Sequence, residues 1–176
     1  MLFCEHLREP PLGNSLTRSR SPIISRKSQN NRPRTMEYNQ VKQSFMECDD
    51  LAVLDDASKA VLFWRGIEKT FRAGDLIYTE GAKLDNTFCL WLSGDLVVEE
   101  AGKALGQISS PRIFGEMAFF SQSQSRLATI RVASPQAAVL ELRLNPEELS
   151  GQFSGLRKNL GVKAWERFVS GSQDRR

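Results

Sequence analysis

Gly115, Glu116 and Arg126 are the residues of this chain whose types and spacing best suit ligand chemistry. Gly115 has no Cβ, so its backbone can approach a ligand closely. Residues 116–120 predict one helical turn, whose free N–H groups can face an anion. Arg126 can hold a phosphate through its rigid fork of donors. Because Glu116 would repel that phosphate, we expect its carboxylate to accept hydrogen bonds from a ribose hydroxyl instead.

The order Phe-Gly-Glu-Met-Ala over residues 114–118, a polar loop, and Arg-Leu-Ala-Thr-Ile over residues 126–130 resembles a known cassette. It is the phosphate-binding cassette of the cyclic nucleotide-binding domain superfamily, to which the catabolite activator protein belongs. In that family the glutamate contacts the ribose 2′-hydroxyl and the arginine pairs with the cyclic phosphate. The resemblance implies a cassette over residues 114–130, with these ligand-binding residues: Gly115, Glu116, Met117, Ala118, Arg126, Leu127 and Ala128.

Short runs rich in β-forming residues lie before and after the cassette, at 76–78, 87–92, 96–98 and 137–144. Glycines at positions 74, 81, 94 and 102 separate the earlier runs at turn spacing. Evenly spaced short strands with glycine turns predict a sandwich or barrel-like all-β unit. The resemblance implies a mainly β fold with flanking helices. Its centre is an eight-stranded β-roll of the double-stranded β-helix or jelly-roll type.

Helices are expected on both sides of the roll. Asp55 and Asp56 predict the start of a helix that ends before Gly66, and Asn145-Pro146 predicts another helix start. After this, apolar residues recur every four positions, which gives a helix with one apolar face: Leu156, Leu160, Ala164 and Phe168. In the family such a helix caps the base, shifts on binding, and in bacterial regulators forms a homodimer interface. A permanent lid fixed in the core by Trp165 and Phe168 explains the pattern equally well.

Aromatic residues near the cassette are interpreted as structural. Phe119 and Phe120 are expected to anchor the cassette turn in the core, and Trp91 is expected to pack within the roll. Glu116 and Arg126 could also pair with each other across the loop, which would leave no working site.

The predicted organisation is a tail at 1–36, N-terminal helices at 37–66, the roll at 67–144, C-terminal helices at 145–170 and a tail at 171–176. The first 40 residues carry seven Lys or Arg side chains against three Asp or Glu, whereas the whole chain has a net charge of +3. The basic character therefore belongs to the tail, where Ser, Asn and Pro favour disorder. A nucleic-acid-binding arm and a transit peptide are alternatives. We favour a third interpretation, in which translation starts at Met36.

Several functional classes find no support in the composition. The three cysteines, Cys4, Cys48 and Cys89, show no metal spacing and fit a reducing cytoplasm, with Cys89 a buried thiol. His6 is the only histidine, which argues against an enzyme or a cupin-type metal site. No apolar run reaches membrane-spanning length. No helix-turn-helix pattern follows the capping helix, so direct DNA binding is not expected.

The resulting hypothesis is a stand-alone regulatory domain that binds cyclic AMP and signals to an unidentified protein effector through movement of its C-terminal helix. Leu127 lies where a Thr is associated with preference for cyclic GMP in the family, so cyclic AMP is favoured. Pro111-Arg112 replaces the usual turn before the cassette. A cyclic dinucleotide stays open as ligand. The alternatives are a degenerate domain that serves as a protein-interaction scaffold and nucleic-acid binding through the basic tail.

Overall fold

The computed structural model describes residues 37–173, and side chains as far as Arg167. The tail expected at 1–36 and the side chains of Phe168 and Val169 lie outside this part. The elements follow in the order α1 (Tyr38–Met46), η1 (Asp49–Leu51), α2 (Asp56–Trp64), β1 (Ile67–Arg72), β2 (Leu76–Tyr78), β3 (Thr87–Ser93), β4 (Leu96–Glu100), β5 (Lys103–Ile108), β6 (Ile113–Phe114), η2 (Glu116–Phe120), β7 (Thr129–Val132), β8 (Gln136–Arg143), α3 (Pro146–Ser150) and α4 (Ser154–Gln173).

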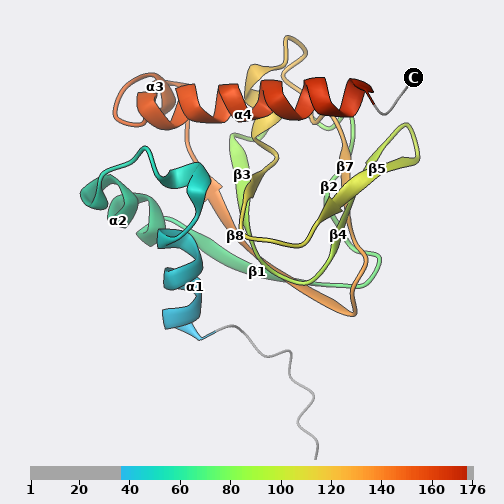
Figure 1. Cartoon of the computed structure of the whole chain (residues 1–176), viewed down its shortest axis with the longest axis horizontal. Helices are drawn as coiled ribbons and strands as arrows, with labels where there is room; N and C mark the ends of the chain where they lie inside the picture. Colours follow the sequence, from blue (N-terminus) through green and yellow to red (C-terminus); the bar gives the residue numbers. More distant parts are fainter. Residues whose placement is uncertain (1–36, 174–176) are drawn as a thin grey trace, which may run out of the picture. The chain divides into compact units, whose positions relative to one another are not determined.

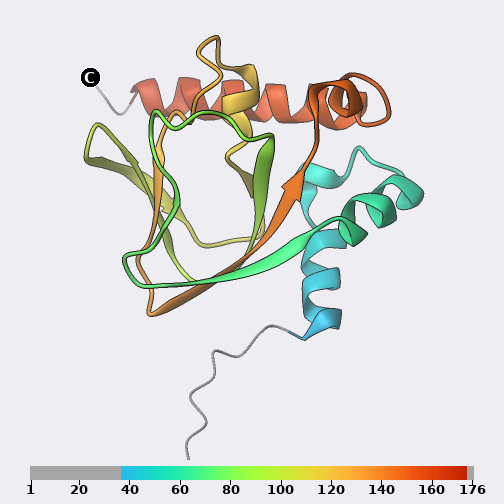
Figure 2. The same ribbon diagram turned by 180° about the vertical axis from the view of Figure 1, so that it is seen from behind.

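Within the described residues, eight strands form two four-stranded antiparallel sheets, ordered β1-β8-β3-β6 and β2-β7-β4-β5. The sheets face each other as a β-roll (Figure 1). Helices α1 and α2 lie beside the first sheet, and α4 runs across one end of the roll in both views (Figures 1 and 2). The predicted mainly β fold with flanking helices is confirmed.

The predicted glycine turns have a common conformational cause. Gly74, Gly81, Gly94 and Gly102 all have positive φ, between 75° and 87°, where L side chains are strained. At Gly94 space is also lacking, because a Cβ would lie 2.5 Å from the carbonyl oxygen of Gln136. This close approach lets the turn between β3 and β4 pack on the start of β8.

The core has two parts, which β3 and β8 separate. One apolar cluster fills the space between the sheets and includes Cys89, Phe114 and Val139. The other joins the outer face of the first sheet to the helices and includes Phe88, Leu140 and Leu156. Strands β3 and β8 are therefore buried on both faces, which explains why their sequences read as nearly continuous apolar runs.

The predicted helix ends agree with the structure. The Asp55 side chain accepts a hydrogen bond from the Ser58 N–H at 2.7 Å, and α2 ends at Trp64. Before α3, the Asn145 side chain accepts from the Glu148 N–H at 2.8 Å, and the Glu148 carboxylate accepts from the Asn145 N–H at 3.0 Å. This capping box fixes the turn from β8 into the C-terminal helices.

Phe120, which was predicted to lie in the core, and Trp165, which one of the two interpretations of α4 placed there, are exposed instead. Leu156, Leu160 and Ala164 bury the apolar face of α4, but Trp165 is 67% exposed, so it does not fix a lid in the core. Phe120, at the end of η2, is 39% exposed and lies against α4 at Gly161. Its neighbour Phe119 is half-buried and packs on the core as expected.

Cys48 and Cys89 are buried free thiols. Burial raises the pKa of Cys48 to about 11 and that of Cys89 to about 12. Both are therefore protonated and unreactive at neutral pH, which agrees with the prediction for Cys89. Trp91 is half-buried, as expected, and its indole N–H donates to the Gly94 carbonyl at 2.7 Å. Within residues 37–173, no helix combines the length and apolarity needed to cross a bilayer.

Candidate functional site

A cavity of about 890 Å³ lies where η2, β4, β5 and β7 face α4 and η1. This volume is within the range of roughly 300–1,000 Å³ that small-molecule sites occupy. The structure brings all seven predicted site residues to its lining: Gly115, Glu116, Met117, Ala118, Arg126, Leu127 and Ala128.

Gly115 begins the cassette with a left-handed backbone, at φ 83°. The sequence interpretation assigned its missing Cβ to close ligand approach. The structure gives a different reason, because a Cβ at Gly115 would lie 2.5 Å from Tyr78 Cε2 and 3.1 Å from Arg126 Nη1. The glycine is needed to admit these two side chains. The helical turn predicted at 116–120 is present as the 3-10 helix η2.

Arg126 is only 4% exposed and is surrounded by groups of the roll. Its Nη1 donates to the Gly115 carbonyl at 2.9 Å, and its Nη2 donates to Thr87 Oγ1 at 2.8 Å and closely to Asp85 Oδ1. Its Cζ lies 3.6 Å from the centre of the Tyr78 ring. These bonds use three of the five N–H donors of the guanidinium, so Nε–H and one Nη1 hydrogen have no hydrogen-bond partner among the described residues.

The backbone of Arg126 is fixed as well. Its N–H donates to the Ala82 carbonyl, and its carbonyl accepts from the Gly81 N–H, both at 2.8 Å. Arg126 precedes strand β7, which begins only at Thr129. Arg126 therefore lies in a loop that is pinned to the turn after β2.

Asp85 stays a carboxylate beside this arginine. Partial burial alone would raise the pKa of Asp85, but hydrogen bonds from Thr87 and the charge of Arg126 outweigh it and lower that pKa below its usual value. Burial also raises the pKa of Tyr78, which keeps its hydroxyl protonated. Arg126 thus has a neutral ring on one face and a carboxylate at one edge.

Glu116 has a different partner, Arg167 of α4. Arg167 Nη1 contacts Glu116 Oε1 closely and donates to the Ile113 carbonyl at 3.0 Å, while Nη2 lies 3.4 Å from Asp50 Oδ2. Asp50 itself accepts from the Ile113 N–H at 2.7 Å, and its carbonyl accepts from Asn159 of α4 at 2.9 Å. The pairing of Glu116 with Arg126, considered as an alternative above, is therefore not what the structure contains.

Glu116 is almost completely enclosed, with 1% of its surface exposed. Desolvation raises its pKa above the ordinary value, and the charge of Arg167 counteracts this only in part. We name the contacts among Glu116, Arg167 and Asp50 the helix latch, because they join η2 and η1 to α4.

One part of the cavity lining is an apolar wall. Ala118 is buried, Met117 and Ala128 are half-buried, and Leu127 is exposed. From the second sheet, Val98 and Ile130 also line the cavity. Gly106 of β5 belongs to this wall, and a Cβ there would meet nothing within 4 Å. Such a surface suits the flat face of a purine base.

Several residues of the site were missed by sequence reasoning: Asp50, Tyr78, Thr87, Asp85 and Arg167. For Arg167 a signal existed, since it follows Leu160 and Ala164 on the buried face of α4, where a charge needs a partner. Thr87 begins the run at 87–92 that was predicted as a strand, but no binding role was assigned to it or to Asp85. Among the described residues, no cluster of His, Cys, Asp or Glu could hold a metal ion.

Comparisons with known proteins agree with this geometry. Residues 68–146 match the family model of the cyclic nucleotide-binding domain. Cyclic AMP-bound PfPKA-R is similar in fold, with a TM-score of 0.64, 18% identity and coverage of 78% of this chain and 45% of that one. For PKAR CBD2 bound to Sp-2Cl-cAMPS, the TM-score is 0.58 with 20% identity, covering 77% of this chain and 92% of that one.

A third similar structure is the regulatory subunit of a cAMP-independent protein kinase A from Trypanosoma cruzi bound to guanosine. Its TM-score is 0.55 with 15% identity, covering 68% of this chain and 42% of that one. This chain therefore spans less than half the length of PfPKA-R and of the T. cruzi protein. At these identities the likeness shows a shared fold. The search of curated proteins returned no match. Residues 68–146 of this chain are therefore assigned to a cyclic nucleotide-binding domain.

Proposed function

We propose that this domain is regulatory rather than catalytic, that it binds cyclic AMP in the cavity, and that it reports binding through α4. The observation that carries the proposal is the state of Arg126. It lines the cavity, is held by the roll, and has two N–H donors without a partner among the described residues. A cyclic phosphate is an acceptor that fits such donors.

The choice of ligand rests on the neighbouring residues. The apolar wall suits a base, and Leu127 offers no hydroxyl to a guanine, so cyclic AMP is the leading ligand and cyclic GMP the second. Among the similar structures, PfPKA-R is cyclic AMP-bound, whereas the T. cruzi protein is cAMP-independent and bound to guanosine. Cyclic AMP and cyclic GMP therefore both belong in the test.

The helix latch supplies a route from ligand to α4. A ribose hydroxyl that hydrogen-bonds to Glu116 would compete with or share the contact that Arg167 makes there. Ligand can shift α4 only by its differential affinity for the latched and unlatched states. A protein effector that contacts α4 would then detect the shift.

The test is calorimetric titration of the full chain with cyclic AMP and cyclic GMP, for the wild type and the Arg126→Lys variant. We expect saturable binding that weakens on the order of 100-fold in the variant, because lysine keeps the charge but loses the fork. Arg131→Lys is the matched control, since Arg131 pairs with Glu99 and does not line the cavity. No binding by folded wild-type protein would reject the proposal.

A second variant locates the ligand without touching any ionic contact. Gly106→Val adds a β-favouring side chain where space is open and the cavity wall begins. We expect weaker cyclic AMP binding with unchanged urea unfolding. Unchanged affinity in Gly106→Val would place the ligand elsewhere.

A further inference from the structure

We propose that Tyr78 is the positioning residue of the phosphate site, which holds the guanidinium of Arg126 in place through its ring. The inference rests on the proposed function, because it assigns a role within the same site. Tyr78 is the last residue of β2 and is 8% exposed. Its ring centre lies 3.6 Å from Arg126 Cζ, a distance at which a cation is attracted to the face of an aromatic ring.

The Tyr78 ring covers one face of the Arg126 guanidinium, which hydrogen bonds in the guanidinium plane cannot restrain. Hydrogen bonds to Gly115, Asp85 and Thr87 lie in the guanidinium plane and restrain its edges. They leave the plane free to tilt, whereas a packed ring prevents this. Since only Nε–H and one Nη1 hydrogen have no partner among the described residues, the tilt decides where these donors lie relative to a phosphate.

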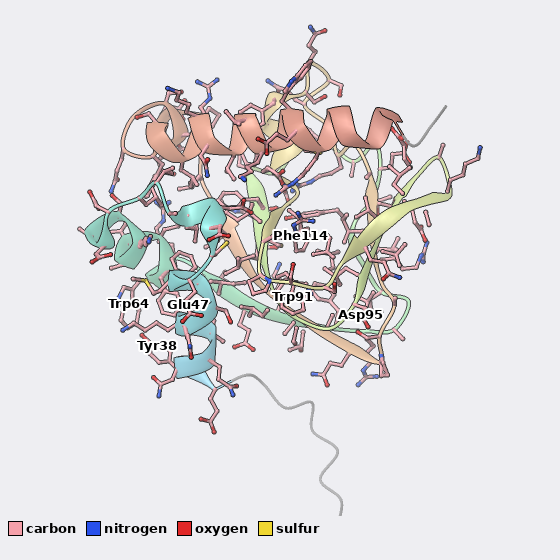
Figure 3. The ribbon with its side chains drawn as sticks, viewed as in Figure 1. Tyr38, Glu47, Trp64, Trp91, Asp95 and Phe114 are labelled. Atoms are coloured by element: carbon pink, nitrogen blue, oxygen red, sulfur yellow. The ribbon has the colours of Figure 1, made fainter. Side chains whose placement is uncertain are left out.

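The ring itself is fixed from the cassette side. It meets the ring of Phe114 edge-on, with centroids 6.0 Å apart and planes at 70°. It also fills the space where a Cβ of residue 115 would lie, 2.5 Å from Tyr78 Cε2. Phe114 lies among the strands of the roll (Figure 3). The cassette therefore holds Tyr78, and Tyr78 holds Arg126.

The hydroxyl of Tyr78 makes a smaller, indirect contribution. It lies 3.3 Å from Thr87 Oγ1 and 3.2 Å from Cys89 Sγ. Thr87 in turn accepts from Arg126. Removing the hydroxyl alone keeps the ring over the guanidinium, while removing the ring abolishes both contacts. A Phe at this position should thus rescue what a Leu loses.

The experiment compares the full-length wild type with Tyr78→Phe, Tyr78→Leu and Phe71→Leu. Phe71 packs on the same apolar cluster but does not line the cavity, so Phe71→Leu controls for loss of an aromatic ring from that core. We expect cyclic AMP affinity to fall about tenfold in Tyr78→Leu, which equals about 1.4 kcal/mol. In Tyr78→Phe and Phe71→Leu we expect it to stay within about threefold of wild type. Equal loss in Tyr78→Leu and Phe71→Leu would overturn the inference.

A ligand-free measurement separates this inference from the proposed function. The Arg126 side-chain Nε–H signal, identified by its absence in Arg126→Lys, should be displaced by the ring current of residue 78. We expect that displacement in the wild type and Tyr78→Phe and its loss in Tyr78→Leu. If it is retained in Tyr78→Leu, the positioning role is wrong. If the displacement behaves as expected but the wild type binds no cyclic nucleotide, the positioning role stands and the proposed ligand fails.

Discussion

Arg126 and Arg167 both line the cavity, and they differ in what holds them. Arg126 is bound by groups of the roll alone, through Gly115, Asp85, Thr87 and the Tyr78 ring. Arg167 comes from α4 and connects that helix to Glu116 of η2 and Asp50 of η1. One arginine is therefore internal to a rigid unit, whereas the other joins three separate elements. The same type of side chain is thus held within the roll at one wall of the cavity and joins separate elements at the other.

The acids paired with these arginines differ in the same sense. Asp85 is 54% exposed at its side chain, and its pKa is lowered. Glu116 is 1% exposed, and its pKa is raised. The contact between Asp85 and Arg126 therefore keeps both charges to lower pH. In the helix latch, Glu116 is protonated and loses its negative charge first as the pH falls. Substitutions and changes of pH should therefore affect the Arg126 side and the Arg167 side of the cavity differently.

The largest effect is expected from Gly115→Ala on the roll side. The new Cβ would meet Tyr78 and Arg126 at a φ of 83°, so it adds a steric clash to backbone strain. We expect a loss of about 2–4 kcal/mol in the free energy of unfolding, measured by urea titration. We also expect loss of cyclic AMP binding.

Gly102→Ala is the control for backbone strain alone. Gly102 has a similar φ of 75°, but a Cβ there would meet nothing within 4 Å. Its cost should be only about 1–2 kcal/mol. Equal costs for the two variants would show that Tyr78 and Arg126 do not pack tightly against Gly115. The description of Arg126 as part of a rigid unit would then be wrong.

A smaller effect is expected from pH, with opposite signs at the two walls. The folded pKa of Glu116 is raised above its ordinary 4.5, so the folded state binds this proton more tightly than the unfolded state. Stability relative to Glu116→Gln should therefore fall as pH rises from about 4.5 through the folded pKa of Glu116, and then level off. The measurement is urea unfolding of both proteins across this range.

Asp85 provides the matched comparison. Its folded pKa lies below its ordinary 3.8, so its contribution is present above that pH and is lost as pH falls through the folded value. Wild type should lose stability relative to Asp85→Asn only under these acidic conditions. If relative stability changed with pH in the same direction for Glu116 and Asp85, the two acids would be held alike. That result would contradict the difference between the Arg126 side and the Arg167 side of the cavity.

The fold was predictable because its signals are local. Glycines at positive φ mark turns, and the double burial of β3 and β8 makes apolar runs. The cassette positions were predictable for the same reason, since residues 114–130 are contiguous. The core position predicted for Phe120 was wrong, and so was the interpretation that placed Trp165 of α4 in the core, because both side chains are apolar in type but exposed.

The partners within the site could not be predicted from local pattern. Arg167 is 51 positions from Glu116 and 117 from Asp50, so only the fold brings them together. The reason for Gly115 was also hidden, because the Tyr78 ring that fills its Cβ space belongs to a strand far upstream. Long-range packing, rather than residue type, decides these contacts.

The smallest effect is expected from Gly161→Ala on α4, the same substitution on the helix side. A Cβ there would lie 3.3 Å from the Phe120 ring, and no positive φ opposes it. Phe120 is exposed enough to move, so the gain in helix propensity of about 1 kcal/mol should nearly offset the tight contact. We expect a change within about 0.5 kcal/mol by urea unfolding. Gly155→Ala, where a Cβ meets nothing within 4 Å, reports the propensity gain alone. If Gly161→Ala instead costs as much as Gly115→Ala, then α4 is held as rigidly as the roll, and a helix so fixed could not report ligand binding by moving.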